Sequence, residues 1–303
     1  EAEQARLAAD ALREARAQGT MAFGDISNTL ATAALFADTG TPAVLFHELL
    51  GFAPHDHQAR AHAGGERVVR ETRSPARPGL APHAPYSTSP ELFQAIAREA
   101  DARALPSSVH LGESPEEVEF LMSGTGGIAD ALKELGVWRD TWTVPRLDPV
   151  AYLDRLGVLK PGLLVVHATQ LTPDALAIAA ARGCVIVSCP RSNRWVGAGD
   201  PPLDDFYASG ATVAFGTDSL ASVESLDMFA ELAAARAVSS VPDATLLESA
   251  TRGGAIALGL GASHGRLAPG LRGPLLAVRV PAGVTDVEEY LVSGMPQERQ
   301  WAG

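Results

Sequence analysis

Four short stretches of this chain end a hydrophobic run in a residue that can bind a metal or carry a proton. They are residues 109–113, 165–167, 187–193 and 215–219. In a parallel α/β barrel the carboxyl ends of the strands converge on one face, which holds the active site. Histidine and aspartate ligands beside a glutamate are the groups of a metal-assisted hydrolase. The sequence therefore predicts a metal-dependent hydrolytic site at one end of a barrel.

The stretch His110-Leu111-Gly112-Glu113 places an imidazole and a carboxylate on one rim, just past a strand. The imidazole of His110 can bind zinc, and Glu113 can take a proton from activated water and pass it to a substrate. His167 ends the next strand of the series. Asp218 follows the last apolar run, where it could alternatively do no more than cap the next helix.

These motifs require strands that alternate with helices, which implies a parallel sheet. An alanine-rich helix over residues 3–18, ended by Gly19, precedes the first strand. The predicted strands are residues 21–26, 43–50, 79–84, 107–111, 163–168, 184–189 and 212–216. The predicted helices are residues 90–103, 116–135, 173–182, 225–237 and 246–258. We expect residues 53–78 to form a mobile loop or loop-helix, and residues 136–150 an excursion beside the active-site face.

The composition narrows the classes of partner. Hydrophobic residues make up 46% of the 303-residue chain, which is enough for a large core, and the net charge is -12. This charge argues against a nucleic-acid polymer or an anionic membrane as the partner and favours a small molecule. No apolar run approaches the length of about 20 residues that spans a bilayer. The only cysteines, Cys184 and Cys189, share one strand, so we expect two buried thiols and a cytoplasmic protein.

The order of these motifs resembles the amidohydrolase superfamily, in particular its zinc-dependent deaminase and chlorohydrolase branch. Residues 265–270 and the strand after them also resemble the family segment that enters a small β-sandwich. The resemblance implies a (β/α)8 barrel over residues 1–262, and a composite small β domain to which residues 263–303 contribute. Because the chain opens on a helix, the first barrel strand is expected to be missing from it. Homodimers also occur among such relatives.

The resemblance also assigns roles to residues. It implies that His110 and Asp218 bind one divalent metal, with zinc as the expected ion and Fe²⁺ or Mn²⁺ as alternatives. Glu113, His167 and Asp218 are then the catalytic groups, with His167 hydrogen-bonding the attacking water. The substrate-contact candidates are His83, Glu48 and Ser219, of which Glu48 suits a ribose-like diol.

One departure from the family pattern concerns the ligand set. Relatives carry a His-x-His pair on the first strand, and the only such pair here is His55-Asp56-His57, which we expect to lie in a solvated loop. His110 and Asp218 alone are fewer than the three protein ligands typical of zinc sites. The missing strand is interpreted as a truncation. The alternative is a degenerate barrel that has lost activity.

The function implied by the resemblance is hydrolytic deamination of an aminated purine or nucleoside ring, with aminodeoxyfutalosine as one candidate substrate. An s-triazine-type chlorohydrolase or another amidohydrolase is an alternative with the same site. A non-enzymatic binding role for an inactive truncated or degenerate barrel is the alternative from a different class. Release of ammonia rather than chloride would separate the first two.

Overall fold

Seven parallel strands form the frame of the molecule in the computed structural model, which describes residues 2–53, 55–271, 273–295 and 297–302. The strands belong to two sheets, ordered β1-β2-β3 and β4-β5-β6-β7. A parallel bridge between Leu80 and Ser107 joins the sheets. All seven predicted strands are confirmed: β1 (Phe23–Ser27), β2 (Ala43–Leu49), β3 (Arg77–Pro82), β4 (Ser108–Leu111), β5 (Leu164–His167), β6 (Val185–Ser188) and β7 (Thr212–Phe215).

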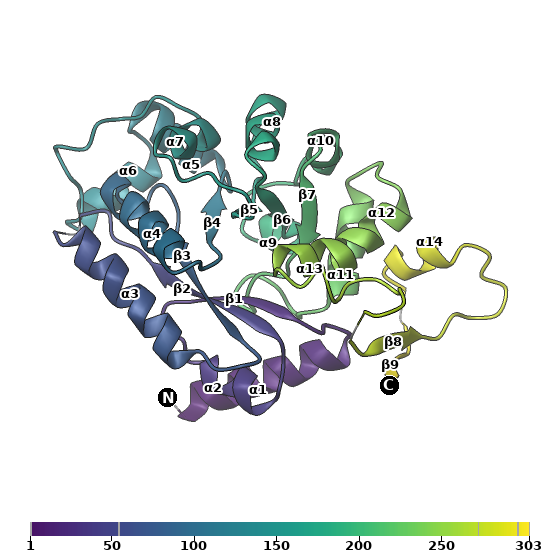
Figure 1. The fold of residues 1–303 in the computed structure, drawn as a ribbon. Helices are drawn as coiled ribbons and strands as arrows, with labels where there is room; N and C mark the ends of the chain where they lie inside the picture. Colours follow the sequence, from purple (N-terminus) through teal and green to yellow (C-terminus); the bar gives the residue numbers. More distant parts are fainter. Residues whose placement is uncertain (1, 54, 272, 296, 303) are drawn as a thin grey trace.

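Helices follow the strands and pack around the outside of this curved array (Figure 1). The helix α1 (Ala2–Ala17) ends just before Gly19, which has a φ of 108°, as the sequence predicts. The helices that follow β1 to β5 are α2 (Ala33–Asp38), α3 (His57–Glu71), α4 (Pro90–Ala102), α5 (Pro115–Ser123), α6 (Gly127–Glu134), α7 (Pro149–Arg155) and α8 (Pro173–Ala181). Those that follow β6 and β7 are α9 (Pro190–Trp195), α10 (Leu203–Ala208), α11 (Met228–Ala237), α12 (Asp243–Glu248), the π-helix η1 (Ser249–Gly253) and α13 (Gly254–Ala257).

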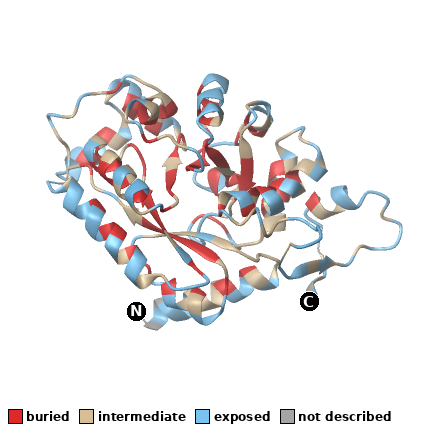
Figure 2. Cartoon of the chain, in the orientation of Figure 1, coloured by how far each residue is buried: buried red, intermediate tan, exposed pale blue. Residues whose placement is uncertain are grey.

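Alternation along each strand divides its side chains between the barrel interior and the helix layer. Val44, Phe46, Leu164, Val185 and Ala214 form one buried cluster inside the array. Their neighbours on the opposite faces pack against the helices in two larger clusters. Figure 2 shows that the buried residues are concentrated on the strands and on the inner sides of the helices. The side chains at the carboxyl ends of the strands continue the same alternation, which positions the candidate site.

Two helix predictions need correction. Residues 116–135 are not one helix, because Gly124 and Gly126, with φ of 72° and 89°, separate α5 from α6. Residues 53–78 take the loop-helix alternative, with the helix α3 over His57–Glu71, so that His57 begins this helix and does not lie in the expected solvated loop. The helix expected over residues 225–237 begins later, at Met228. Residues 136–148 do form the expected excursion, and both cysteines are buried and free.

The segment after α11 lies against β7, the last strand of the parallel array. Gly253 of η1 approaches β7 so closely that a Cβ there would lie 2.2 Å from the Val213 carbonyl oxygen. Leu258, just after α13, joins the cluster inside the array and contacts Gly24 of β1. This segment therefore connects the two outer strands of the array. That a (β/α)8 barrel lacks its first strand in this chain stays a prediction.

The C-terminal part forms a separate pair of antiparallel strands, β8 (Leu275–Val278) and β9 (Arg299–Ala302), with α14 (Val287–Val292) between them. Its strands dock on the end of α1: the Trp301 indole N–H donates to the Arg16 carbonyl at 2.7 Å, and Arg299 donates to the Gln18 carbonyl at 2.9 Å. A complete β-sandwich at this end stays a prediction. Within the described ranges, no helix combines the length and apolar character that crossing a bilayer requires.

Candidate active site

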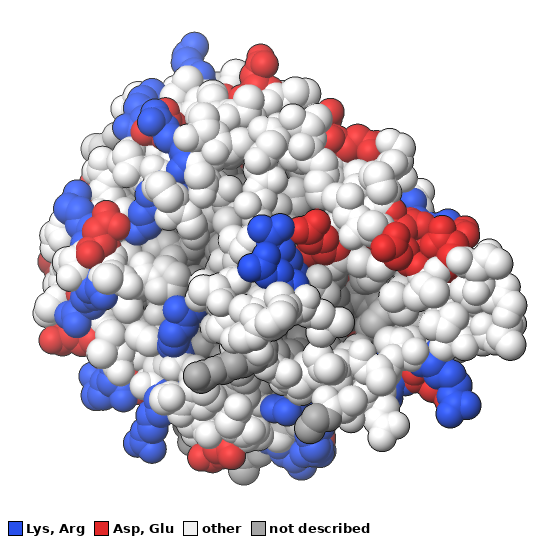
Figure 3. Space-filling model, turned by 45° about the vertical axis from the view of Figure 1, so that its right-hand side comes forward, with Lys and Arg blue, Asp and Glu red and all other residues white. Residues whose placement is uncertain are grey.

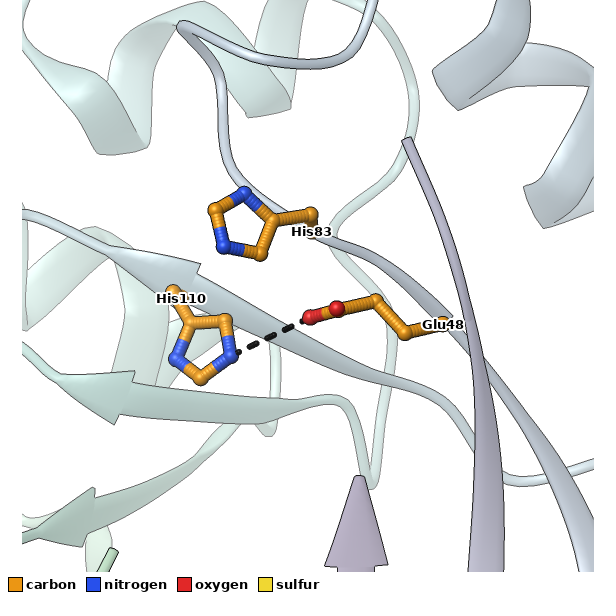
Figure 4. Close-up of side chains that lie close together, drawn as sticks. All are labelled: Glu48, His83 and His110. Atoms are coloured by element: carbon orange, nitrogen blue, oxygen red, sulfur yellow. Dashed lines mark ion pairs between the residues drawn. The ribbon is translucent and has the colours of Figure 1, made fainter. Parts of the chain in front are cut away.

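Three side chains from adjacent strands converge at the carboxyl end of the barrel. Glu48 on β2, His83 just past β3 and His110 on β4 each offer a ligand atom, and these atoms all lie within 4.8 Å of one another. Figure 4 shows the three side chains pointing toward one another. Each continues the inward-facing alternation of its strand, because Val109 and Leu111 on either side of His110 pack in the helix layer. The fold thus brings together residues predicted separately.

His110 stands at the centre of this group. Its Nε2 lies 3.5 Å from Oε1 of Glu48, and its Nδ1 lies 3.2 Å from Nε2 of His167. Burial alone would lower the pKa of His110, but the hydrogen bond to Glu48 and the charges of Glu48, Glu113 and Asp218 raise it. The acidic groups around His110 therefore favour its protonated form. A cation has the same electrostatic reason to bind here.

Glu48 is held from both sides. Its Oε2 accepts a hydrogen bond of 2.8 Å from the Asn28 side chain, which belongs to the loop after β1. Burial would raise the pKa of Glu48, but the hydrogen bond to His110 and the nearby imidazoles of His83 and His110 lower it. Glu48 is therefore a carboxylate with a fixed orientation, which suits it to bind a cation or a pair of hydroxyl groups.

His83 lies on the other side of His110, with 5.2 Å between the ring centroids. Its Nδ1 is hydrogen-bonded to the Ser87 hydroxyl, and its ring meets the Tyr86 ring edge to face at 5.8 Å. Burial lowers the pKa of His83, so its ring is neutral near pH 7. With Nδ1 engaged, Nε2 is the atom left to contact a ligand.

His167 reaches the site through an unusual backbone. Its φ is 74° and that of Ala168 is 57°, so the chain leaves β5 in the left-handed region, which side chains other than glycine seldom adopt. The imidazole is buried, with Nδ1 2.8 Å from Oδ1 of Asn193 and Nε2 3.6 Å from Oε1 of Glu113. Burial lowers the pKa of His167 and keeps it neutral. Strain of this kind is common where a side chain must be aimed at a reaction centre.

A buried carboxylate organises the turn that carries Glu113. Glu117 accepts hydrogen bonds from the backbone N–H groups of Gly112 at 2.9 Å and Glu113 at 3.1 Å. Burial raises the pKa of Glu117 to about 7. Ser114 caps the helix α5 that follows, which begins with Pro115 and two acidic residues, a sequence typical of a helix start. Glu113 is therefore presented from a fixed turn.

Asp218 lies just past β7 with a φ of 60°. Its Oδ2 accepts hydrogen bonds from Ser192 at 2.6 Å and Ser222 at 3.2 Å, and its Oδ1 accepts from the Ser219 N–H at 2.8 Å. Burial would raise the pKa of Asp218, but the Ser192 hydroxyl and the His167 and His110 rings lower it. Asp218 stands outside the group of three, although its charge acts on His110. Ser219 is exposed beside it.

The donor set fits a divalent metal. Two imidazoles and a carboxylate are ligands that zinc accepts, and iron or manganese accept them as well. Among the residues that the structure describes, Glu48, His83 and His110 form the one group of three donors within this distance. The pair His55 and His57 is not part of it. The assignment of Asp218 and His110 as the metal ligands stays a prediction.

Sequence reasoning missed the residues that support the site. Asn193, Ser192 and Ser222 orient His167 and Asp218, and Glu117 orients the turn before α5. Only the string Cys189-Pro190-Arg191-Ser192-Asn193 gave a signal, because its polar residues follow a strand directly. The other supporting residues are single polar side chains in helices and loops, where the sequence cannot show their partners.

Comparison with known proteins agrees with this geometry. The model of the amidohydrolase family matches residues 7–294. Aminodeoxyfutalosine deaminase from Deinococcus radiodurans is 35% identical over 236 residues, which cover 73% of this chain and 55% of that protein. The chain therefore spans about half the length of that relative.

Solved structures share the fold. An adenosine deaminase from Xanthomonas campestris with bound zinc has a TM-score of 0.78 and 28% identity, covering 95% of this chain and 65% of that one. Helicobacter pylori aminofutalosine deaminase has a TM-score of 0.85 and 24% identity, covering 95% and 72%. Because the family model spans nearly the whole sequence, this chain belongs to the amidohydrolase family.

Proposed function

We propose that this chain carries the catalytic groups of a metal-dependent hydrolase that removes the amino group from a purine or nucleoside ring. The observation that supports this best is the convergence of Glu48, His83 and His110 next to Glu113 and His167. Relatives named for aminodeoxyfutalosine and adenosine support an aminated nucleoside as the substrate class. Aminodeoxyfutalosine itself is one candidate.

The proposed chemistry replaces a ring C–NH2 group by C=O, consuming water and releasing ammonia. A divalent metal supplies the Lewis acidity that activates water near neutral pH. His110 and Asp218 would hold the metal. Glu113 carries a proton to the ring nitrogen and then to the leaving amine. His167, neutral and fixed, is proposed to hydrogen-bond the attacking water when that water displaces the 3.2 Å contact between Nε2 of His167 and Nδ1 of His110.

The remaining roles concern recognition. The carboxylate of Glu48 suits two neighbouring hydroxyl groups of a sugar, and Nε2 of His83 suits a third polar group. Ser219 is exposed beside Asp218 and is proposed to contact the ring. We place the catalytic barrel in residues 1–262 and the small β domain in residues 263–303; the separate sheet of β8 and β9 supports this division.

A small molecule is the proposed partner, and a homodimer in the cytoplasm is the proposed setting. On the face drawn in Figure 3, Lys and Arg side chains are interspersed with Asp and Glu side chains. Together with the net charge of -12, this supports a partner other than a nucleic-acid polymer or an anionic membrane.

The test combines metal content with product detection. The purified protein is stripped with a chelator, reloaded with zinc, and supplied with adenosine, methylthioadenosine and aminodeoxyfutalosine while ammonia is measured. The expected result is bound zinc and ammonia release, which falls by roughly 10²–10⁴-fold in Glu113→Gln. That variant should retain its zinc and its thermal midpoint.

Chloride release from an s-triazine, with no ammonia from any aminated purine, would overturn the proposed substrate class. Ammonia release that is unchanged in Glu113→Gln would overturn the proposed proton carrier. Zinc-loaded protein that is inert toward every substrate would favour a binding role instead.

A further inference from the structure

Asn193 joins the site through a continuous line of hydrogen bonds. It lies on α9 and is fully buried, and its side chain hydrogen-bonds to Thr169 and His167. Its Nδ2 donates to Oγ1 of Thr169 at 2.8 Å, and its Oδ1 lies 2.8 Å from Nδ1 of His167. Beyond this imidazole, Nε2 of His167 lies 3.2 Å from Nδ1 of His110. The line therefore runs from Thr169 to His110.

The direction of each bond follows from the chemistry of the groups. An amide offers a carbonyl that only accepts and an NH2 group that only donates. Because the NH2 group of Asn193 faces the Thr169 hydroxyl, its carbonyl faces the imidazole of His167. That imidazole must then donate, which places a proton on its Nδ1. In a neutral imidazole the other nitrogen, Nε2, accepts.

The other end of the line leads to the same assignment. A ring nitrogen that binds a metal carries no proton, so His110 can bind through Nε2, on the Glu48 side, only with its proton on Nδ1. This N–H needs an acceptor, and Nε2 of His167 is placed 3.2 Å away. His167 can accept there only if its own proton is on Nδ1, opposite Asn193.

We propose that Asn193 is a positioning residue that fixes the proton of His167 on Nδ1, which directs the proton of His110 to Nδ1 and leaves Nε2 of His110 open to a divalent cation. The assignment of the His110 proton rests on the proposed function, because it follows from a metal at Nε2, whereas the position of the His167 proton rests on the hydrogen bonds of Asn193 alone. Outer hydrogen-bond partners of ligating histidines commonly set the tautomer and the orientation of the ring in this way. Here one amide sets two rings.

The opposite amide orientation makes a different prediction. With Nδ2 of Asn193 facing His167, Nδ1 of the ring would accept and its Nε2 would carry the proton. That proton would point toward Nδ1 of His110 at 3.2 Å or Oε1 of Glu113 at 3.6 Å. His110 would then hold its proton on Nε2, where a metal could not bind without displacing it. The two orientations therefore differ in which ring nitrogen is protonated.

The experiment reads these protons directly. Protein labelled with ¹⁵N in histidine is examined by long-range ¹H–¹⁵N correlation without metal and with added zinc, and His167 is identified by the signal lost in His167→Asn. We expect the Nδ1–H form of His167 in the wild type. In Asn193→Leu, which keeps the volume but has no acceptor, we expect His167 to change to the Nε2–H form and zinc affinity to fall by roughly 10–100-fold.

Two further variants separate positioning from folding. Asn193→Asp keeps an oxygen acceptor at this place and should restore the Nδ1–H form. Gln170→Ala removes another side chain that braces the segment after α9, through its 2.6 Å bond to the Ala198 carbonyl, and should leave His167 unchanged. All variants are measured at a temperature well below the lowest of their thermal midpoints.

Three results would overturn the proposal. They are an Nε2–H form in the wild type, an unchanged tautomer in Asn193→Leu, and a changed tautomer in Gln170→Ala. If the tautomers are as expected but the protein releases no ammonia from any substrate, Asn193 is still the positioning residue and the proposed function is rejected. Ammonia release with the wrong tautomers would reject the positioning role alone.

Discussion

Glu231 on α11 predicts a measurable loss of stability at high pH. Its side chain has no exposed surface and accepts two hydrogen bonds from Arg191, one of 3.1 Å from the backbone N–H and one of 3.5 Å from the guanidinium. Burial raises the pKa of Glu231 from 4.5 to about 7, although the Arg191 guanidinium at 3.5 Å opposes this. The folded protein therefore keeps a proton that the unfolded chain has already released. Stability contributed by this group is complete below about pH 4.5 and is lost as the pH rises through about 7.

The magnitude follows from the two pKa values. Between about pH 5 and pH 8.5, a group with a pKa near 4.5 unfolded and near 7 folded lowers the free energy of unfolding by about 2.5 kcal/mol. Glu231→Gln removes this group while keeping an acceptor for the Arg191 N–H. From about pH 5 to about pH 8.5, the wild type should therefore lose about 2.5 kcal/mol of its free energy of unfolding relative to Glu231→Gln.

The assay is urea unfolding followed by circular dichroism at both pH values and constant ionic strength. Glu134→Gln, which changes an exposed glutamate at the end of α6, is the matched control and should show no such pH dependence. A difference between Glu231→Gln and the wild type that stays constant with pH, or that moves in favour of the wild type, would refute the reasoning.

Three other substitutions test local packing, each by urea unfolding. Gly253→Ala should cost about 1–3 kcal/mol, because its Cβ would meet the Val213 carbonyl at 2.2 Å; a neutral effect would contradict the close approach of η1 to β7. Phe120→Ala should cost about 3–5 kcal/mol, since the ring is fully buried and stacks on Trp142 at 4.6 Å. Asp148→Ala should cost about 1 kcal/mol, because this side chain accepts two backbone hydrogen bonds at the start of α7; no loss would mean that water replaces the cap.

The strands and their terminal residues were predictable for a physical reason. Interior strands of a parallel sheet are buried on both faces, so they read as continuous apolar runs that stop where the chain reaches the surface. His83, His110 and His167 stand at such stops, and the fold brings them together through 5.2 Å and 5.3 Å ring contacts. Their mutual contact needed the structure, because neighbouring strands are far apart in sequence.

The helix α3 could be predicted only as one of two alternatives, because glycine has two uses. Gly64 and Gly65 weaken a helical pattern, so the sequence leaves both a loop and a loop-helix open. In the structure a Cβ at Gly64 would lie 2.8 Å from the Leu49 side chain, and one at Gly65 would lie 2.7 Å from the Glu99 carboxylate. These glycines allow α3 to pack closely against β2 and α4. Only the tertiary contact distinguishes this use from a turn.

The docking of β9 on α1 has a consequence for the order of folding. The carbonyl groups of Arg16 and Gln18 receive hydrogen bonds from Trp301 and Arg299, which lie 285 and 281 residues further along the chain. Synthesis proceeds from the N-terminus, so the end of α1 is made early but gains these partners only after nearly all the other residues have been added. The first helix is thus completed by the last strand, and this contact closes the longest loop among the hydrogen bonds of the described residues.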